Sequence, residues 1–171
     1  MITADATVLI ALAKMRRLSL LRQLYGQVVI GEIVKTEVVD QGKSIAALGV
    51  EQVESAIDEG WVKIVQLNPK EHKAMRRVLS RSGLDPGEAE SLALAQSRKL
   101  QVILDDKEAR AFAETLGLKY LGTAAVLLQA FVEKRVTLEE MEEMVQDLSR
   151  ILWLSPGVVA EILKRAKEGR K

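Results

Sequence analysis

Acidic residues follow two stretches of this sequence that are expected to form strands. Asp5 lies in TADAT directly after the first short apolar run, and Asp105 and Asp106 end the apolar run VILDD. Both places are the carboxyl ends of predicted strands. In open α/β sheets ligands bind at that edge, so acids from two strands can meet there. The spacing therefore predicts a cluster of carboxylates.

Two glutamates extend this candidate cluster. Glu37 lies in IGEIVKTEVV, among apolar residues that share one side of a predicted helix. A charge in an aliphatic stripe is costly unless it has a partner, so packing alone does not explain Glu37. Glu88 opens the helix PGEAESLALA, and Glu90 lies two residues further on. Both glutamates are candidates for the same pocket.

Carboxylates that converge on one pocket repel one another unless a positive charge lies between them. A divalent cation is the simplest such charge. The chain has no cysteine and a single histidine, His72, which excludes thiolate sites and clusters of imidazole ligands. A serine triad would depend on His72 alone. Oxygen ligands without nitrogen or sulfur favour Mg²⁺ or Mn²⁺ over zinc.

Each acid also fits a helix cap. The run from Asp85 to Glu88 spells a capping box with proline at the first helical position. Asp5 fits the N-cap of the helix that follows it, and one of Asp105 and Asp106 fits the cap of the next helix, which leaves the other free for a metal. Both interpretations stay open at this point.

The composition indicates one globular domain with a sizeable core. The chain has 171 residues, of which 48% are hydrophobic and 29% charged, and its net charge is +1. This charge argues against binding nucleic acid by bulk electrostatics. No apolar run approaches the roughly 20 residues of a membrane span, and the first residues lack the basic start of a signal peptide. We expect a cytoplasmic protein without a membrane segment.

Short apolar runs alternate with helical patterns, which predicts an α/β fold with a parallel sheet. Strands are expected at 1–3, 27–31, 61–67, 101–106 and 119–122. Helices are expected at 7–15, 19–26, around Glu37, and at 50–60, 69–81, 88–100, 107–117, 123–134, 137–152 and 155–169. The stretch DQGKS, 40–44, is expected to be a loop.

A basic face on the predicted helix 69–81 could contact phosphate. Its members recur at spacings of three and four residues: Lys70, Lys73, Arg77 and Arg81. A solvated helix face fits the same pattern, so both interpretations remain.

Taken together, these motifs resemble the PIN-domain ribonucleases, a family that includes the toxins of many prokaryotic toxin–antitoxin pairs. ADATVLIALAKMRRLSLLRQLYGQVVIGEIVKTEV is similar to the opening of the family. GLDPGEAESLALAQSRKLQVILDDKEARAFAETLGLKYLGTAAVLL resembles a prokaryotic branch with a Gly-Glu-Ala-Glu helix start and paired aspartates. The resemblance implies a three-layer α/β/α fold around a mostly parallel sheet. It implies one PIN-like domain over 1–171, with 137–171 as a C-terminal helical extension.

The resemblance also implies a site. Its catalytic, metal-binding acids would be Asp5, Glu37, Glu88 and Asp106, with Asp105 and Glu90 as alternates. Many members have aspartate where this chain has Glu88, so the resemblance leaves open whether one or two ions bind. Thr7 and Thr123 resemble hydroxyl positions that support the pocket, and helix capping is the alternative for both.

The activity implied by the resemblance is hydrolysis of phosphodiester bonds in single-stranded RNA with Mg²⁺ or Mn²⁺, Asp106 or Glu88 being the candidate base. An antitoxin is the implied partner. The alternative is a non-catalytic module that binds RNA or a protein. The apolar helices 123–134 and 137–148 would either form a homodimer surface or pack inside the monomer. A haloacid-type phosphatase is excluded because it needs a second aspartate where Thr7 stands, and a receiver domain needs an acidic pair there.

Overall fold

A five-stranded parallel sheet forms the centre of the computed structural model, which describes residues 1–168. The strands are β1 (Ile2–Ala4), β2 (Val28–Gly31), β3 (Val62–Val65), β4 (Val102–Ile103) and β5 (Tyr120–Leu121). Their order in the sheet is β3-β2-β1-β4-β5, and every neighbouring pair is parallel. The α/β class and the parallel sheet predicted from the sequence are confirmed.

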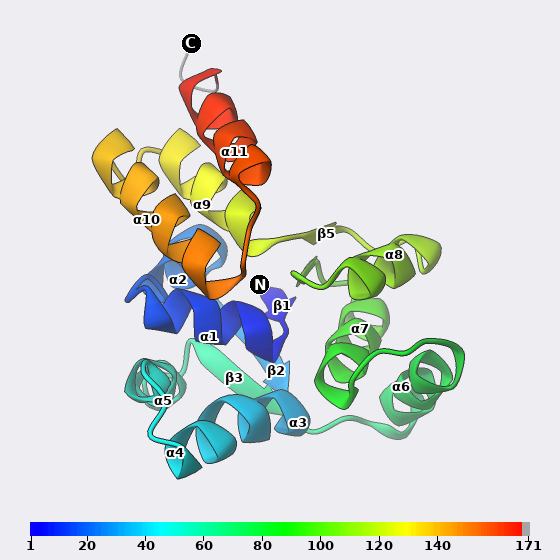
Figure 1. Cartoon of the computed structure of the whole chain (residues 1–171). Helices are drawn as coiled ribbons and strands as arrows, with labels where there is room; N and C mark the ends of the chain where they lie inside the picture. Colours follow the sequence, from blue (N-terminus) through cyan, green and yellow to red (C-terminus); the bar gives the residue numbers. More distant parts are fainter. Residues whose placement is uncertain (169–171) are drawn as a thin grey trace.

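Helices cover both faces of this sheet (Figure 1). One face carries α1 (Ala6–Lys14), α2 (Ser19–Tyr25), α5 (Val50–Asp58) and α9 (Thr123–Val132). The other carries α6 (Pro69–Arg81), α7 (Pro86–Arg98) and α8 (Lys107–Thr115). Each layer has its own apolar core, the larger one around Leu12 and Phe131 and the smaller one around Leu92. The result is the predicted three-layer arrangement.

The two C-terminal helices, α10 (Leu138–Ile151) and α11 (Pro156–Glu168), pack together and against α9. Met141, Met144 and Leu148 are buried in the larger core, so the apolar faces of α9 and α10 pack inside the monomer. Residues 169–171 of the predicted extension lie outside the described range. Within residues 1–168 no helix is both long and apolar enough to cross a membrane.

The segment after β2 is helical for longer than the sequence predicted. It comprises α3 (Glu32–Lys35), a π-helix η1 (Thr36–Gln41) and α4 (Gly42–Ser44), so the predicted loop at 40–44 is wrong. Gly42 serves close packing rather than a turn, since a Cβ there would lie 2.6 Å from Val50 Cγ2. Glu37 lies in the first turn of η1.

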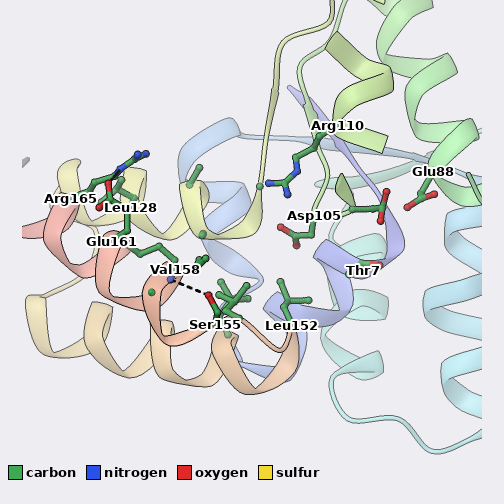
Figure 2. A pocket seen from close by; sticks show the side chains of 18 residues that line it. Thr7, Glu88, Asp105, Arg110, Leu128, Leu152, Ser155, Val158, Glu161 and Arg165 are labelled. Atoms are coloured by element: carbon green, nitrogen blue, oxygen red, sulfur yellow. Dashed lines mark hydrogen bonds and ion pairs between the residues drawn. The ribbon is translucent and has the colours of Figure 1, made fainter. Parts of the chain in front are cut away.

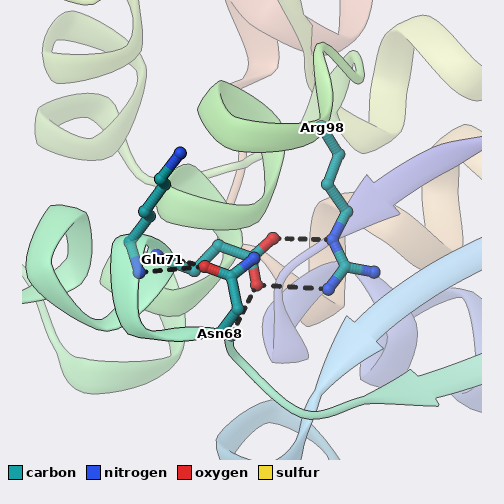
Figure 3. Close-up of polar contacts among 4 residues, drawn as sticks. Asn68, Glu71 and Arg98 are labelled. Carbon is teal, nitrogen blue, oxygen red and sulfur yellow. Dashed lines mark hydrogen bonds and ion pairs between the residues drawn. The ribbon is translucent and has the colours of Figure 1, made fainter.

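The cap of α6 and an ion pair join α6 to α7 (Figure 3). Asn68 caps the helix in a box with Glu71, and Pro69 occupies the first turn, so α6 has the predicted bounds. The carboxylate of Glu71 is 1% exposed and accepts hydrogen bonds from Arg98 Nε at 2.7 Å and Arg98 Nη2 at 3.2 Å. This ion pair therefore fixes α6 against α7, the helix that carries candidate site residues.

Candidate active site

Asp5 lies at the carboxyl end of β1 and caps α1. The backbone N–H of Val8 donates to Asp5 Oδ1 at 2.9 Å, while Asp5 Oδ2 is buried and has no hydrogen-bond partner among the described residues. The pKa of Asp5 is raised to about 8, mainly by burial and also by the charges of Asp105, Glu88 and Asp85, against the lowering effect of the Val8 hydrogen bond. Asp5 is thus both the predicted cap and a carboxylate with one free oxygen.

Asp105 and Asp106 follow β4, the strand beside β1, and have different partners. Thr123 donates to both oxygens of Asp105, from its backbone N–H at 2.8 Å and from its hydroxyl at 2.5 Å. Asp106 is the N-cap of α8 and accepts from the backbone N–H of Ala109 at 2.8 Å. The second aspartate of the pair therefore caps the helix. Thr123 is fully buried and, rather than capping α9, orients Asp105.

Glu37 reaches from η1 to the first turn of α7. A Cβ placed on Gly87 would lie 2.5 Å from Glu37 Oε2, so the carboxylate rests against the glycine backbone. The pKa of Glu37 is raised to about 7, mainly by burial and also by the charges of Asp85, Glu90 and Glu88. Glu37 is consequently brought to the same end of α7 as Glu88.

Glu88 takes part in the predicted capping box and also faces the candidate site. Its backbone N–H donates to Asp85 Oδ1 at 2.8 Å, and its Oε2 accepts from the N–H of Asp85 at 3.0 Å. Burial raises the pKa of Glu88, as do the charges of Asp85 and Asp106. The cap and the site are therefore not exclusive interpretations for this residue.

Glu90 is buried on the other side of α7 and caps α3. Its carboxylate accepts from the backbone N–H groups of Ile33 at 3.0 Å and Val34 at 3.0 Å. A Cβ on Gly31 would lie 2.0 Å from Glu90 Cδ, so only glycine fits there. This contact holds the start of the segment that carries Glu37.

An open cavity of about 940 Å³ lies beside Glu88, Asp105 and Asp106 (Figure 2). Thr7, Glu88, Asp105, Asp106 and Arg110 line its inner end. The outer walls come from α9, α10 and α11 and include Leu128, Leu152, Val158, Glu161 and Arg165. The C-terminal helices thus form part of the approach to the acids.

The acids fit a divalent cation in their chemistry. Within residues 1–168 no group of three or more His, Cys, Asp or Glu side chains is arranged to enclose an ion as the side chains stand. Asp5 Oδ2, however, is a buried carboxylate oxygen without a partner, and Glu88 and Asp105 are near enough to raise the pKa of Asp5. Such oxygen donors suit Mg²⁺ or Mn²⁺.

The predicted basic face is exposed but lies apart from the cavity. Lys70, Lys73, Arg77 and Arg81 are all exposed on α6, and none of them lines the cavity. Sequence reasoning did not assign roles at the site to Asp85 or Arg110. From the sequence, Asp85 is identified only as a helix cap. The one signal that points to Arg110 is its position one helical turn after Asp106.

Comparison with known proteins gives the family of the chain. A PIN-domain family model matches residues 1–168, so the chain belongs to the PIN-domain family. No curated protein matches the chain. PIN domains are typically nucleases, and they generally use divalent metal ions and bind RNA. Membership of this family therefore indicates nuclease activity in general.

Proposed function

We propose that the protein is a metal-dependent endoribonuclease that hydrolyses phosphodiester bonds of single-stranded RNA. The observation that carries this proposal is Asp5 Oδ2, a buried carboxylate oxygen that has no hydrogen-bond partner within residues 1–168 and lies beside Asp105 and Glu88. A buried, unpaired carboxylate among like charges is unfavourable until it takes up a proton or binds a cation. Membership of the PIN-domain family supports the same chemistry.

Asp5, Glu37, Glu88 and Asp106 would hold one or two Mg²⁺ or Mn²⁺ ions. Asp105 is the alternate for Asp106: Asp106 uses one oxygen as the cap of α8, and Asp105 accepts from Thr123 on both oxygens. Glu90 is left as a helix cap, since backbone N–H groups occupy its carboxylate. A bound ion would supply a water of lowered pKa as the nucleophile.

The proton from that water needs an acceptor on the protein. Glu88 is half-buried, lines the cavity and has a raised pKa, which makes it a better base near neutral pH than an ordinary glutamate. Asp106 lines the same cavity and is the second candidate. Thr123 would act indirectly, by holding Asp105 in place.

The proposal includes a role as the toxin of a toxin–antitoxin pair, with an antitoxin protein as partner and a homodimer as the assembly. Trp153 is exposed in the turn before α11. Val158 is exposed in the first turn of α11 and lines the cavity. Expression of the protein should arrest growth of a bacterial host, and Asp5→Asn should relieve the arrest. Size-exclusion chromatography with light scattering tests the dimer, and a monomeric mass contradicts it.

A non-catalytic module that binds RNA or a partner is the second candidate. The observation in its favour is that no three acids of residues 1–168 are arranged around an ion as they stand. Such a module would bind RNA equally well with Mn²⁺ and with chelator, and would leave the RNA intact.

The deciding experiment incubates the purified protein with end-labelled single-stranded RNA and Mg²⁺ or Mn²⁺. We expect internal cleavage that chelator stops and that single-stranded DNA of the same sequence does not undergo. Asp5→Asn should abolish cleavage without unfolding the protein, because asparagine keeps the oxygen that accepts from Val8. Cleavage that persists in this variant points to a contaminating nuclease and overturns the assignment.

A further inference from the structure

Arg110 lies in the wall of the cavity beside the acids. It belongs to α8, and its side chain is half-buried. A Cβ placed on Gly122 would lie 3.6 Å from Arg110 Nη1 and 3.0 Å from Asp105 Oδ1. The guanidinium and the carboxylate therefore flank the same point of the cavity wall, as Figure 2 shows.

The guanidinium of Arg110 has no ion pair or hydrogen bond within residues 1–168. Other arginines of the chain bind carboxylates: Arg98 pairs with Glu71 at 2.7 Å, and Arg165, in the same cavity, pairs with Glu161 at 2.8 Å. A half-buried guanidinium offers five donors in a fixed plane. In Arg110 these donors face the cavity without a protein acceptor.

We propose that Arg110 binds the non-bridging oxygens of a phosphodiester that enters this cavity. This inference rests on the proposed ribonuclease function. Carboxylates alone repel a polyanion, so a site of acids needs a positive group that attracts the strand next to them. The planar fork of arginine matches two phosphate oxygens at once. Arg110 is thus a substrate-binding residue, distinct from the exposed cations of α6.

The test measures equilibrium binding of labelled single-stranded RNA in an Asp5→Asn background, which prevents cleavage. Arg110→Gln should raise the Kd about 10- to 100-fold, the usual effect of losing a charge-assisted contact. Arg110→Lys keeps the charge but not the fork, so its Kd should lie between the two. Arg22→Gln is the matched control, because Arg22 lies on α2, pairs with Glu59 outside the cavity, and its loss should change the Kd less than twofold.

A second arm identifies the contacted group. RNA strands that each carry one neutral methylphosphonate linkage are scanned for the position that weakens binding. In the protein that keeps Arg110, a methylphosphonate at one particular linkage should lower the affinity about tenfold. In Arg110→Gln, the same methylphosphonate should cause no further loss of affinity. Such coupling shows that the residue and that phosphate interact, which a change in overall charge does not produce.

Two results overturn the inference alone. One is cleavage and binding by Arg110→Gln equal to those of the parent. The other is a normal Kd together with a lower melting temperature in chelator, which makes Arg110 a counter-charge for the acids. If the parent protein neither binds nor cleaves RNA, the proposed function fails and the inference fails with it.

Discussion

The carboxylate of Glu37 lies against the α-carbon of Gly87, where a Cβ would come within 2.5 Å of Oε2. Gly87 is buried in the first turn of α7, so the missing side chain leaves room for a carboxylate from η1. The N-terminus of a helix favours negative charge. Burial and the neighbouring acids nevertheless raise the pKa of Glu37 to about 7, so the helix end only partly offsets their effect.

Gly87→Ala should separate activity from stability. The new methyl group displaces the Glu37 carboxylate, which is the flexible end of a side chain, so the fold can adapt. Alanine also favours the helix over glycine, by up to about 1 kcal/mol. We expect a melting temperature equal to or above that of the parent and RNA cleavage reduced at least about tenfold. Gly83→Ala is the control, since a Cβ there meets only Glu108 at 3.6 Å. Unchanged cleavage by Gly87→Ala contradicts a role of Glu37 at the site.

Glu37→Gln should have opposite effects with and without metal. The change removes one of several like charges, so the metal-free variant should melt at a higher temperature than the parent at pH 8. It also removes a proposed ligand, so Mn²⁺ should stabilise the variant less than the parent. Thermal melts in chelator and in Mn²⁺ measure both effects. A variant that is less stable without metal, or equally stabilised by it, makes Glu37 a structural hydrogen-bonding residue.

The metal-free protein should lose stability as the pH rises from about 4 to about 8. The pKa of Asp5 is raised from 3.8 to about 8 and that of Glu37 from 4.5 to about 7, so the folded state holds more protons than the unfolded state in this window. The free energy of unfolding then falls with pH, by at most about 1.4 kcal/mol per pH unit for each extra proton. Carboxyls with a lowered pKa, such as Glu71, change the free energy of unfolding with pH only below about pH 4.5.

Denaturant unfolding in chelator across this range measures the slope. Asp5→Asn should flatten it, because that variant lacks the larger of the two raised pKa values. The free energy of unfolding is measured between pH 5 and pH 8, in steps of about one pH unit. A value that is constant or rises over this range would contradict the burial of an uncompensated charge at Asp5.

The contact between Glu71 and Arg98 should matter for stability and not for cleavage. Arg98→Ala leaves a carboxylate that is 1% exposed without its cation, and we expect a loss of about 2 kcal/mol in urea unfolding. Arg150→Ala is the control: its pair with Asp147 is 75% and 51% exposed, so the loss should be below about 0.5 kcal/mol. Equal effects of the two variants contradict the importance of the buried pair.

The exposed cations of α6 should add affinity for substrate without chemistry. Neutralising Lys73 and Arg77 to glutamine should weaken RNA binding and reduce the slope of log Kd against log salt by about 0.7 per lost contact. Metal binding should not change, because neither residue lines the cavity. The control neutralises Arg22 and Arg150 on other helices. An unchanged salt slope means that the face is only solvated.

Most elements of the fold could be predicted from the sequence, because the signals for them lie in residues that are adjacent in the chain. The capping box of Asp85 and Glu88 gives the start of α7, and the mostly apolar circumference of that helix indicates that it is buried. The stretch 40–44 was misread because Gly42 looks like a turn residue, whereas its role is to let Val50 approach. That role depends on packing between segments, which no local pattern records.

The site divides in the same way. The acids could be found because each ends a strand or begins a helix, but their partners could not. Whether Asp105 or Asp106 caps α8 depends on Thr123, which meets Asp105 only because β4 and β5 are neighbours. Arg110 lies near Asp105 because α8 begins directly after Asp106, but only the folded protein shows that its guanidinium has no partner within residues 1–168.

The pairing of β1 with β4 also decides when the protein can become active. Thr3 pairs with Val102, so Asp5 is translated long before the strand that brings Asp105 beside it. Domains emerge from the ribosome with the N-terminal part first, and contacts between distant segments form slowly. A nascent chain therefore carries Asp5 without the neighbours that complete the acidic pocket. We expect such a chain to be harmless to the message that encodes it until β4, β5 and the helices behind them have been made.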